Sequence, residues 1–412
     1  MRRHAKTLLA GTIIAIPVWL MAYGAASSQS TVDNSQEQDG AVFAGQTLNV
    51  VTSSDDTATT TATGNAFSGS VVAGDLDMTS QQTLTGTSGA LNNLNVAQYA
   101  GSGTVTTAAT GNTGDATVTS GGTLTGQVTQ SVTSSAVSAN SNVNAGNAQI
   151  GQGSFETQAI ANSQSFVSGD SAVNASVSQL NQADTTATGN ATIGYMPGDA
   201  VFTAGAVGNN VTSIGAGAAS QSLGIAQSNQ SSVVQAVQIT GLGDSQNTLT
   251  NATASANNVN ITNEQGPLGV AVNQDNEAAV IAYGEEDALQ FGGATVTAQA
   301  VGNSTLAGNV GTSVALDNVQ VNGTGGVDST VTINGGSGFD MAGASTAIGN
   351  AATAYACSEC GGVMDITNSQ TNGSDVSAKS IIGITGDQAR SISGTTTAVG
   401  NSASFYVTKP GG

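Results

Sequence analysis

The chain has 412 residues and a formal net charge of −20, with 26 Asp and Glu residues against six Lys and Arg. Nucleic-acid-binding proteins neutralise phosphates with clustered Lys and Arg, so this composition excludes nucleic acid as a partner. The only histidine is His4, close to the amino end. A Ser-His-Asp or Cys-His catalytic arrangement is therefore excluded in the body of the chain.

The first 26 residues have the pattern of a secretory signal peptide. Three basic residues precede an apolar run at residues 8–21, and the small residues 24–26 follow it. This order predicts export and cleavage after Ala26. Beyond it we expect a polar entry segment at residues 27–56, a repetitive β array at residues 57–408 and a short tail at residues 409–412.

One short motif, Ala-x-x-(Gly/Ala)-Asn, recurs along the whole array. Its Asn residues are spaced by 46 to 51 residues, as the steps from Asn257 to Asn303 and from Asn350 to Asn401 illustrate. A fixed period of this size indicates an array in which each unit packs on its neighbours. The motif Asn residues are Asn65, Asn112, Asn162, Asn209, Asn257, Asn303, Asn350 and Asn401.

A second recurring position is a Gln that lies 29 to 32 residues before the next motif Asn. In the last five copies it extends to Gln-x-Asn. The Gln residues are Gln36, Gln82, Gln130, Gln179, Gln227, Gln274, Gln320 and Gln370, and the added Asn residues are Asn181, Asn229, Asn276, Asn322 and Asn372.

Short alternating runs of Val and Thr, such as residues 330–333, predict β-strands, and Gly-Gly, Asn-Gly and Gly-Asp steps predict the turns between them. Residues 278–282 are ambiguous between helix and strand. The fold class is therefore all-β, an elongated β-solenoid or β-helix of eight repeats of about 47 residues. Two rungs per repeat would give a rod of about 75 Å at roughly 4.8 Å per rung. A β-propeller is the alternative, but propeller blades usually carry bulky packing residues that are missing here.

Stacking would place like residues above one another, so that amide side chains hydrogen-bond along the axis. We therefore predict a structural ladder of Gln179, Asn181, Asn209, Gln227, Asn229, Asn257, Gln274, Asn276, Asn303, Gln320, Asn322, Asn350, Gln370, Asn372 and Asn401. Small residues beside the Asn suit tight corners, where a larger side chain would clash.

Three other features of the sequence are candidate sites of chemistry. Cys357 and Cys360 form a lone Cys-x-x-Cys, which favours one structural disulfide over a redox pair or half a metal site. Residues 335–340 resemble a single calcium nonapeptide, but calcium β-rolls need tandem copies, which favours a turn. The acidic cluster of residues 285–287 is consistent with paired catalytic carboxylates, but a solvated turn is the preferred interpretation. We predict no catalytic residue, cofactor site or metal site.

The signal peptide, the acidic Thr/Ala/Gly/Asn-rich composition and the Thr-Ala-x-Gly-Asn segments at residues 61–65, 346–350 and 397–401 resemble the holdfast attachment protein D family. The resemblance implies a non-enzymatic protein at the outer-membrane surface that anchors the polysaccharide holdfast to the envelope. It implies an outer-membrane lipoprotein exporter and an amyloid-like companion anchor subunit as partners, and it supplies no functional residues.

The residues alone predict an exported structural or adhesive protein, because they combine secretion with a repetitive β scaffold. The open ends of such a rod predict a homo-multimer. Two alternatives remain, an amyloid-like fibre subunit and, less favoured, a β-helix enzyme that degrades polysaccharide.

Overall fold

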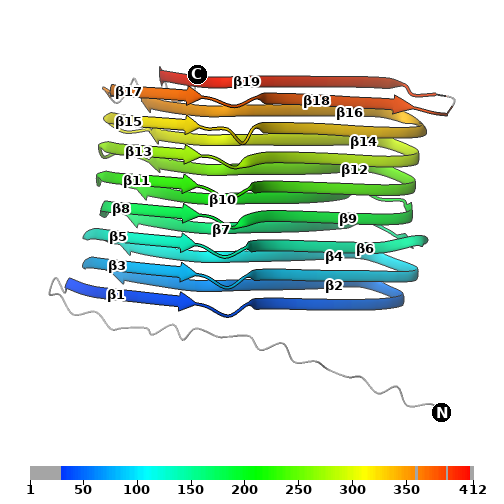
Figure 1. Ribbon diagram of the computed structural model, residues 1–412, viewed down its shortest axis with the longest axis horizontal. Coiled ribbons are helices and arrows are strands. Elements are labelled where there is room, and N and C mark those ends of the chain that lie inside the picture. Colours follow the sequence, from blue (N-terminus) through cyan, green and yellow to red (C-terminus); the bar gives the residue numbers. More distant parts are fainter. Residues whose placement is uncertain (1–28, 358–360, 387, 409–412) are drawn as a thin grey trace, which may run out of the picture.

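A computed structural model describes residues 29–357, 361–386 and 388–408, and nearly all of them lie in β-strands. Within these residues no helix is long and apolar enough to cross a membrane. The strands form two parallel sheets (Figure 1). The eight-stranded one, here called the Gln sheet, contains β1 (Gln29–Gln38), β3 (Asp75–Leu84), β5 (Thr123–Val132), β8 (Ala172–Asn181), β11 (Gln221–Asn229), β13 (Leu268–Asn276), β15 (Ser313–Asn322) and β17 (Val363–Asn372).

The second sheet, here called the long sheet, has eleven strands. They are β2 (Val42–Val72), β4 (Ser88–Thr119), β6 (Ala136–Ile150), β7 (Gly153–Gly169), β9 (Asp184–Met196), β10 (Ala200–Ala216), β12 (Val233–Asn263), β14 (Ala279–Asn309), β16 (Val327–Cys357), β18 (Val376–Ile384) and β19 (Ser391–Thr408). The chain alternates between the sheets. One Gln-sheet strand followed by its part of the long sheet is called a coil below.

Strands pair in parallel with those of the neighbouring coil, and like positions of the sequence motifs lie side by side. Gln36 pairs with Gln82, and Asn65 pairs with Asn112. Paired residues are therefore one full repeat apart in the sequence, so each repeat forms one complete turn of the stack. The expectation of two rungs per repeat is wrong, and eight stacked strands at about 4.8 Å span about 38 Å. Every pairing among the described strands is parallel, which excludes the antiparallel blades of the propeller alternative.

Three coils interrupt the long strand, which is split into β6 and β7, into β9 and β10 and, in the last coil, into β18 and β19, whereas the other coils keep it continuous. The continuous strand β4 pairs with both β6 and β7, and three coils later β12 pairs with both β9 and β10. These six strands thereby form a closed ring of pairings. The second break spans residues 197–199 and begins with Pro197. Proline lacks the backbone N–H that the ladder needs, so pairing stops there.

Each coil is flattened into two layers. The Gln-sheet strand and the first half of the long strand form one layer, and the second half of the long strand returns behind them (Figure 1). One core of Val, Ala and Leu lies between the two halves of the long strands, and another lies between the Gln sheet and the returning half. Alternation places every second side chain inside. Of the ambiguous residues at 278–282, the last four start β14, where Val280 and Ala282 are buried.

Candidate functional site

The eight motif Asn side chains form one continuous hydrogen-bonded column, here called the Asn column. Each Nδ2 from Asn65 to Asn350 donates to the Oδ1 of the Asn one coil further on, at 2.7–2.9 Å. The same nitrogen donates across the coil to a backbone carbonyl of the Gln-sheet layer, at 2.8–3.0 Å. Each amide therefore joins neighbouring coils and also joins the two layers. Buried polar groups are stable only when they are satisfied in this way.

The small residue before each motif Asn has a steric reason. At Gly208–Asn209 and Ala256–Asn257 two consecutive residues point inward, which breaks the alternation and forms a local irregularity in the strand. A Cβ on Gly302 would lie 2.4 Å from the carbonyl oxygen of Gly349, and one on Gly208 would lie 2.5 Å from that of Ala256. The backbones of neighbouring coils approach too closely here for any large side chain.

The Gln column runs beside the Asn column with the opposite polarity. Each Nε2 from Gln82 to Gln370 donates to the Oε1 of the preceding coil, at 2.7–2.9 Å. Each also donates across the coil to a backbone carbonyl of the returning strand, at 2.8–3.0 Å. The cross-links of the Asn column run from the returning strand to the Gln sheet, so the two sets bind the layers from both sides.

A third column contains the Gln-x-Asn asparagines of the last five coils. It runs from Asn181 through Asn229, Asn276 and Asn322 to Asn372, with spacings of 2.7–3.1 Å. Asn181 and Asn276 also accept backbone N–H groups two residues further on, which shapes the turn between the sheets. Leu84 and Val132 take this position in the second and third coils, beside Gly64 and Gly111.

The cysteine pair lies at the end of the last long strand. Cys357 is disulfide-bonded and almost fully buried at the end of β16. Cys360 lies outside the described residues.

The acidic cluster at residues 285–287 is not a solvated turn, contrary to the sequence interpretation. Glu286 is fully buried in β14, where it accepts hydrogen bonds from the hydroxyls of Thr248 and, at 3.0 Å, Thr250. Burial raises the pKa of Glu286 from 4.5 to about 7, an effect that the two threonine hydrogen bonds oppose. The sequence feature that could have indicated this burial is strand alternation, because Glu286 occupies an inward position between the inward residues Gly284 and Ala288.

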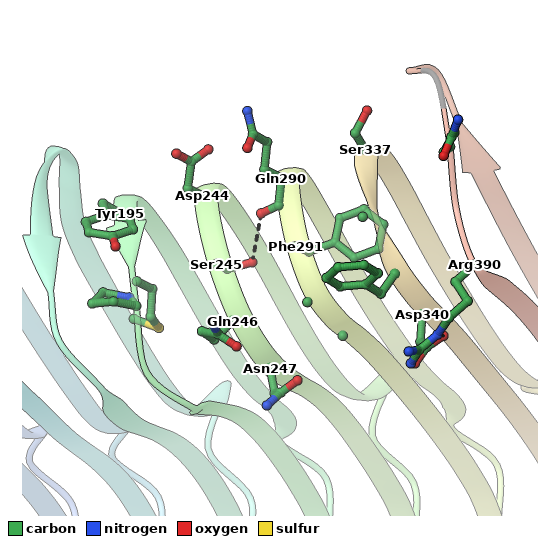
Figure 2. A pocket seen from close by; sticks show the side chains of 17 residues that line it. Tyr195, Asp244, Ser245, Gln246, Asn247, Gln290, Phe291, Ser337, Asp340 and Arg390 are labelled. Atoms are coloured by element: carbon green, nitrogen blue, oxygen red, sulfur yellow. Dashed lines mark hydrogen bonds and ion pairs between the residues drawn. The ribbon is translucent and has the colours of Figure 1, made fainter.

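A groove along one corner of the stack was not predicted from the sequence. At this corner the first half of each long strand turns back, and register places one side chain per coil in a row, here called the corner stripe. Figure 2 shows Asp244, Gln290 and Ser337 projecting from successive turns. The corner stripe consists of Thr52, Tyr99, Gln149, Tyr195, Asp244, Gln290 and Ser337.

The groove lies beside the C-terminal half of the corner stripe and has a volume of about 830 Å³. Tyr195 and Phe339 are 45% and 59% exposed there, although aromatic residues are scarce in this chain. Arg390 lies 5.5 Å from the Phe339 ring centre and forms an ion pair with Asp340. The Arg390 hydrogen bond holds the pKa of Asp340 below its ordinary value. The groove therefore combines aromatic faces, amides and a paired charge.

The calcium-like segment at residues 335–340 contributes to this same groove. Asp340, the carboxylate of that segment, is paired with Arg390. No group of three or more potential metal ligands occurs in the part of the chain that the structure describes.

The fold and these features define a class of protein, a repetitive parallel-β scaffold with amide columns inside and a shallow polar and aromatic groove outside. The chain belongs to the holdfast attachment protein D family, whose model matches residues 50–326 and 323–412. Membership implies a role in holdfast attachment and association with the cell surface. Comparisons with curated proteins and with solved structures found no match.

Proposed function

We propose that this chain is a non-enzymatic, exported surface protein that anchors a polysaccharide adhesin, the holdfast, to the outer membrane. Its scaffold in this proposal is a β-solenoid of eight coils, within which the Asn and Gln columns form a structural ladder. Membership of the holdfast attachment protein D family supports the attachment role. Interlocked amide columns support a role that resists mechanical force, because each amide joins coils and layers together.

The observation that carries the sugar-binding part of the proposal is the corner groove. Pyranose rings have apolar faces that pack on exposed aromatic rings, and their hydroxyls bind amides and carboxylates. Tyr195 and Phe339 offer the rings, and Asp244, Gln290 and Asn247 offer the polar groups. Regular spacing of about 4.8 Å along the corner stripe suits a long polymer better than a small molecule.

Replacing both aromatic residues, Tyr195→Ala with Phe339→Ala, is expected to weaken binding of purified holdfast polysaccharide by about tenfold or more, as loss of a contact anchor does. Binding is measured by sedimentation of labelled polysaccharide with the purified protein. Ile214→Ala, which removes an exposed apolar side chain outside the stripe, serves as the control. Equal binding by the double variant and the control would exclude the groove as the sugar site.

The proposal includes export through the leader at residues 1–26. Deleting these residues is expected to retain the protein inside the cell, because the translocation signal is lost. Protease added to intact cells should then degrade the full-length product and spare the truncated one. Equal protection of both products would contradict a surface location.

The proposed partners are an outer-membrane lipoprotein exporter, a companion anchor subunit and further copies of this chain. The first two are proposed from the resemblance to the family. The third is supported by the open ends of the stack.

A further inference from the structure

Both ends of the stack carry sheet edges that have a neighbour on one side only. At the N-terminal end β1 pairs only with β3 and β2 only with β4, and at the C-terminal end β17, β18 and β19 pair only with β15 and β16 (Figure 1). Edge strands present unpaired N–H and C=O groups to any further strand. The described residues contain no segment that covers either edge.

The two cores are also open at both ends. Val42 and Leu48 in the first coil and Ile382 and Ile384 in the last are only partly buried, although they pack on the same core. The inward side chains of β1 and β17 are likewise half-buried, whereas those of β3 and β15 are buried. Another coil on either end would bury them and extend the cores without a break.

The polarity of the hydrogen bonds in the amide columns makes the two ends of the stack chemically different. At the C-terminal end, Asn401 has an unused Nδ2 hydrogen and Gln370 an unused Oε1, because no described coil follows. At the N-terminal end the roles are reversed: among the described residues, Asn65 Oδ1 accepts no hydrogen bond and one Nε2 hydrogen of Gln36 has no partner. Each unused donor at one end therefore matches an unused acceptor at the other, in the same column.

We infer that copies of this chain stack head to tail, with the last coil of one copy pairing in parallel with the first coil of the next. Asn401 then donates to Asn65 of the next copy, and Gln36 of the next copy donates to Gln370. Like ends brought together with the columns in line would place donor against donor. This inference rests on the multimer part of the proposed function and specifies how the copies meet. It does not depend on the anchoring role or on sugar binding.

The lengths of the end strands agree with this register. Strands β1 and β17 both have ten residues, and Gln36 and Gln370 both occupy the eighth position. In this register the two outward carboxylates of β1, Asp33 and Glu37, face Thr367 and Thr371. Along β1 and β17 no carboxylate then lies directly opposite another, and the nearest approach is the diagonal one between Asp33 and Asp365.

Substitutions that change the charge at these positions test the inference. Thr367→Asp with Thr371→Asp creates two like-charge pairs with Asp33 and Glu37, which should weaken assembly by more than about tenfold. Adding Asp33→Lys and Glu37→Lys to the same chain should restore assembly by forming opposite-charge pairs. All four side chains point outward, and the one like-charge contact that the Asp substitutions create within a copy, at position 367 opposite Asp317, is solvent-exposed, so the fold of each copy is expected to stay intact.

The assay is sedimentation and electron microscopy of protein purified from the cell surface, without polysaccharide. The parent and the control Thr367→Asn with Thr371→Asn should form filaments with an axial repeat of about 38 Å. Monomers or closed dimers at all concentrations would overturn the inference, as would filaments that ignore the Asp substitutions or are not rescued by Lys. Polysaccharide binding by the Asp variant is measured separately, so failure of stacking and failure of the anchoring role remain distinguishable.

Discussion

Replacing Gln274 by Leu is expected to lower the free energy of unfolding by on the order of 4 kcal/mol. Gln274 is fully buried and donates to Gln227 Oε1 and to the backbone carbonyl of Ser304, while it accepts from Gln320 and Thr305. Leu has a similar size but removes the partner of two acceptors and of two donors inside the stack, although Gln320 can still donate to Thr305. Each such group costs about 1–3 kcal/mol.

The measurement is urea unfolding followed by circular dichroism. The control is Asn273→Leu, which makes a comparable change on the same strand at an exposed position and should alter stability by less than about 0.5 kcal/mol. Equal unfolding midpoints for the two variants would show that the Gln column does not stabilise the stack.

The second large effect is a loss of stability with rising pH that depends on Glu286. Its pKa is about 7 in the folded chain against 4.5 in the unfolded one. Below pH 4.5 the carboxyl is protonated in both states, so its contribution to stability is then fully present. Between these values unfolding releases a proton and stability falls, and above about pH 7 the loss reaches about 3 kcal/mol.

Glu286→Gln is expected to abolish this pH dependence, because the amide stays neutral and can still bind both threonine hydroxyls. The variant should therefore be more stable than the parent at pH values above the folded pKa and similar to it at acidic pH. Urea unfolding across this range, with the exposed Glu156→Gln as the matched control, measures the difference. A parent that is as stable in alkaline as in mildly acidic buffer would rule out a buried ionising carboxyl.

The repeat period and the polar residues that recur in it were visible in the sequence because stacking requires like residues at like positions. Alternating Val and Thr indicated strands for the same reason that Val280 and Ala282 face inward, since a strand buries every second side chain. The all-β class with parallel contacts between repeats therefore followed from spacing and alternation. The family resemblance rested on the Thr-Ala-x-Gly-Asn segments and is supported by the family match across most of the chain.

Only the tertiary structure decided how many residues one turn of the stack contains. Residue spacing is equally compatible with one or two rungs per repeat, whereas the pairing of Gln36 with Gln82 requires one. The burial of Glu286 and the corner groove were likewise hidden, because both arise where residues about 40 or more positions apart meet across layers or coils. Local composition and periodicity carry no information about such contacts. The polarity of the amide columns, which gives the stack its two unlike ends, also exists only once the coils lie on one another.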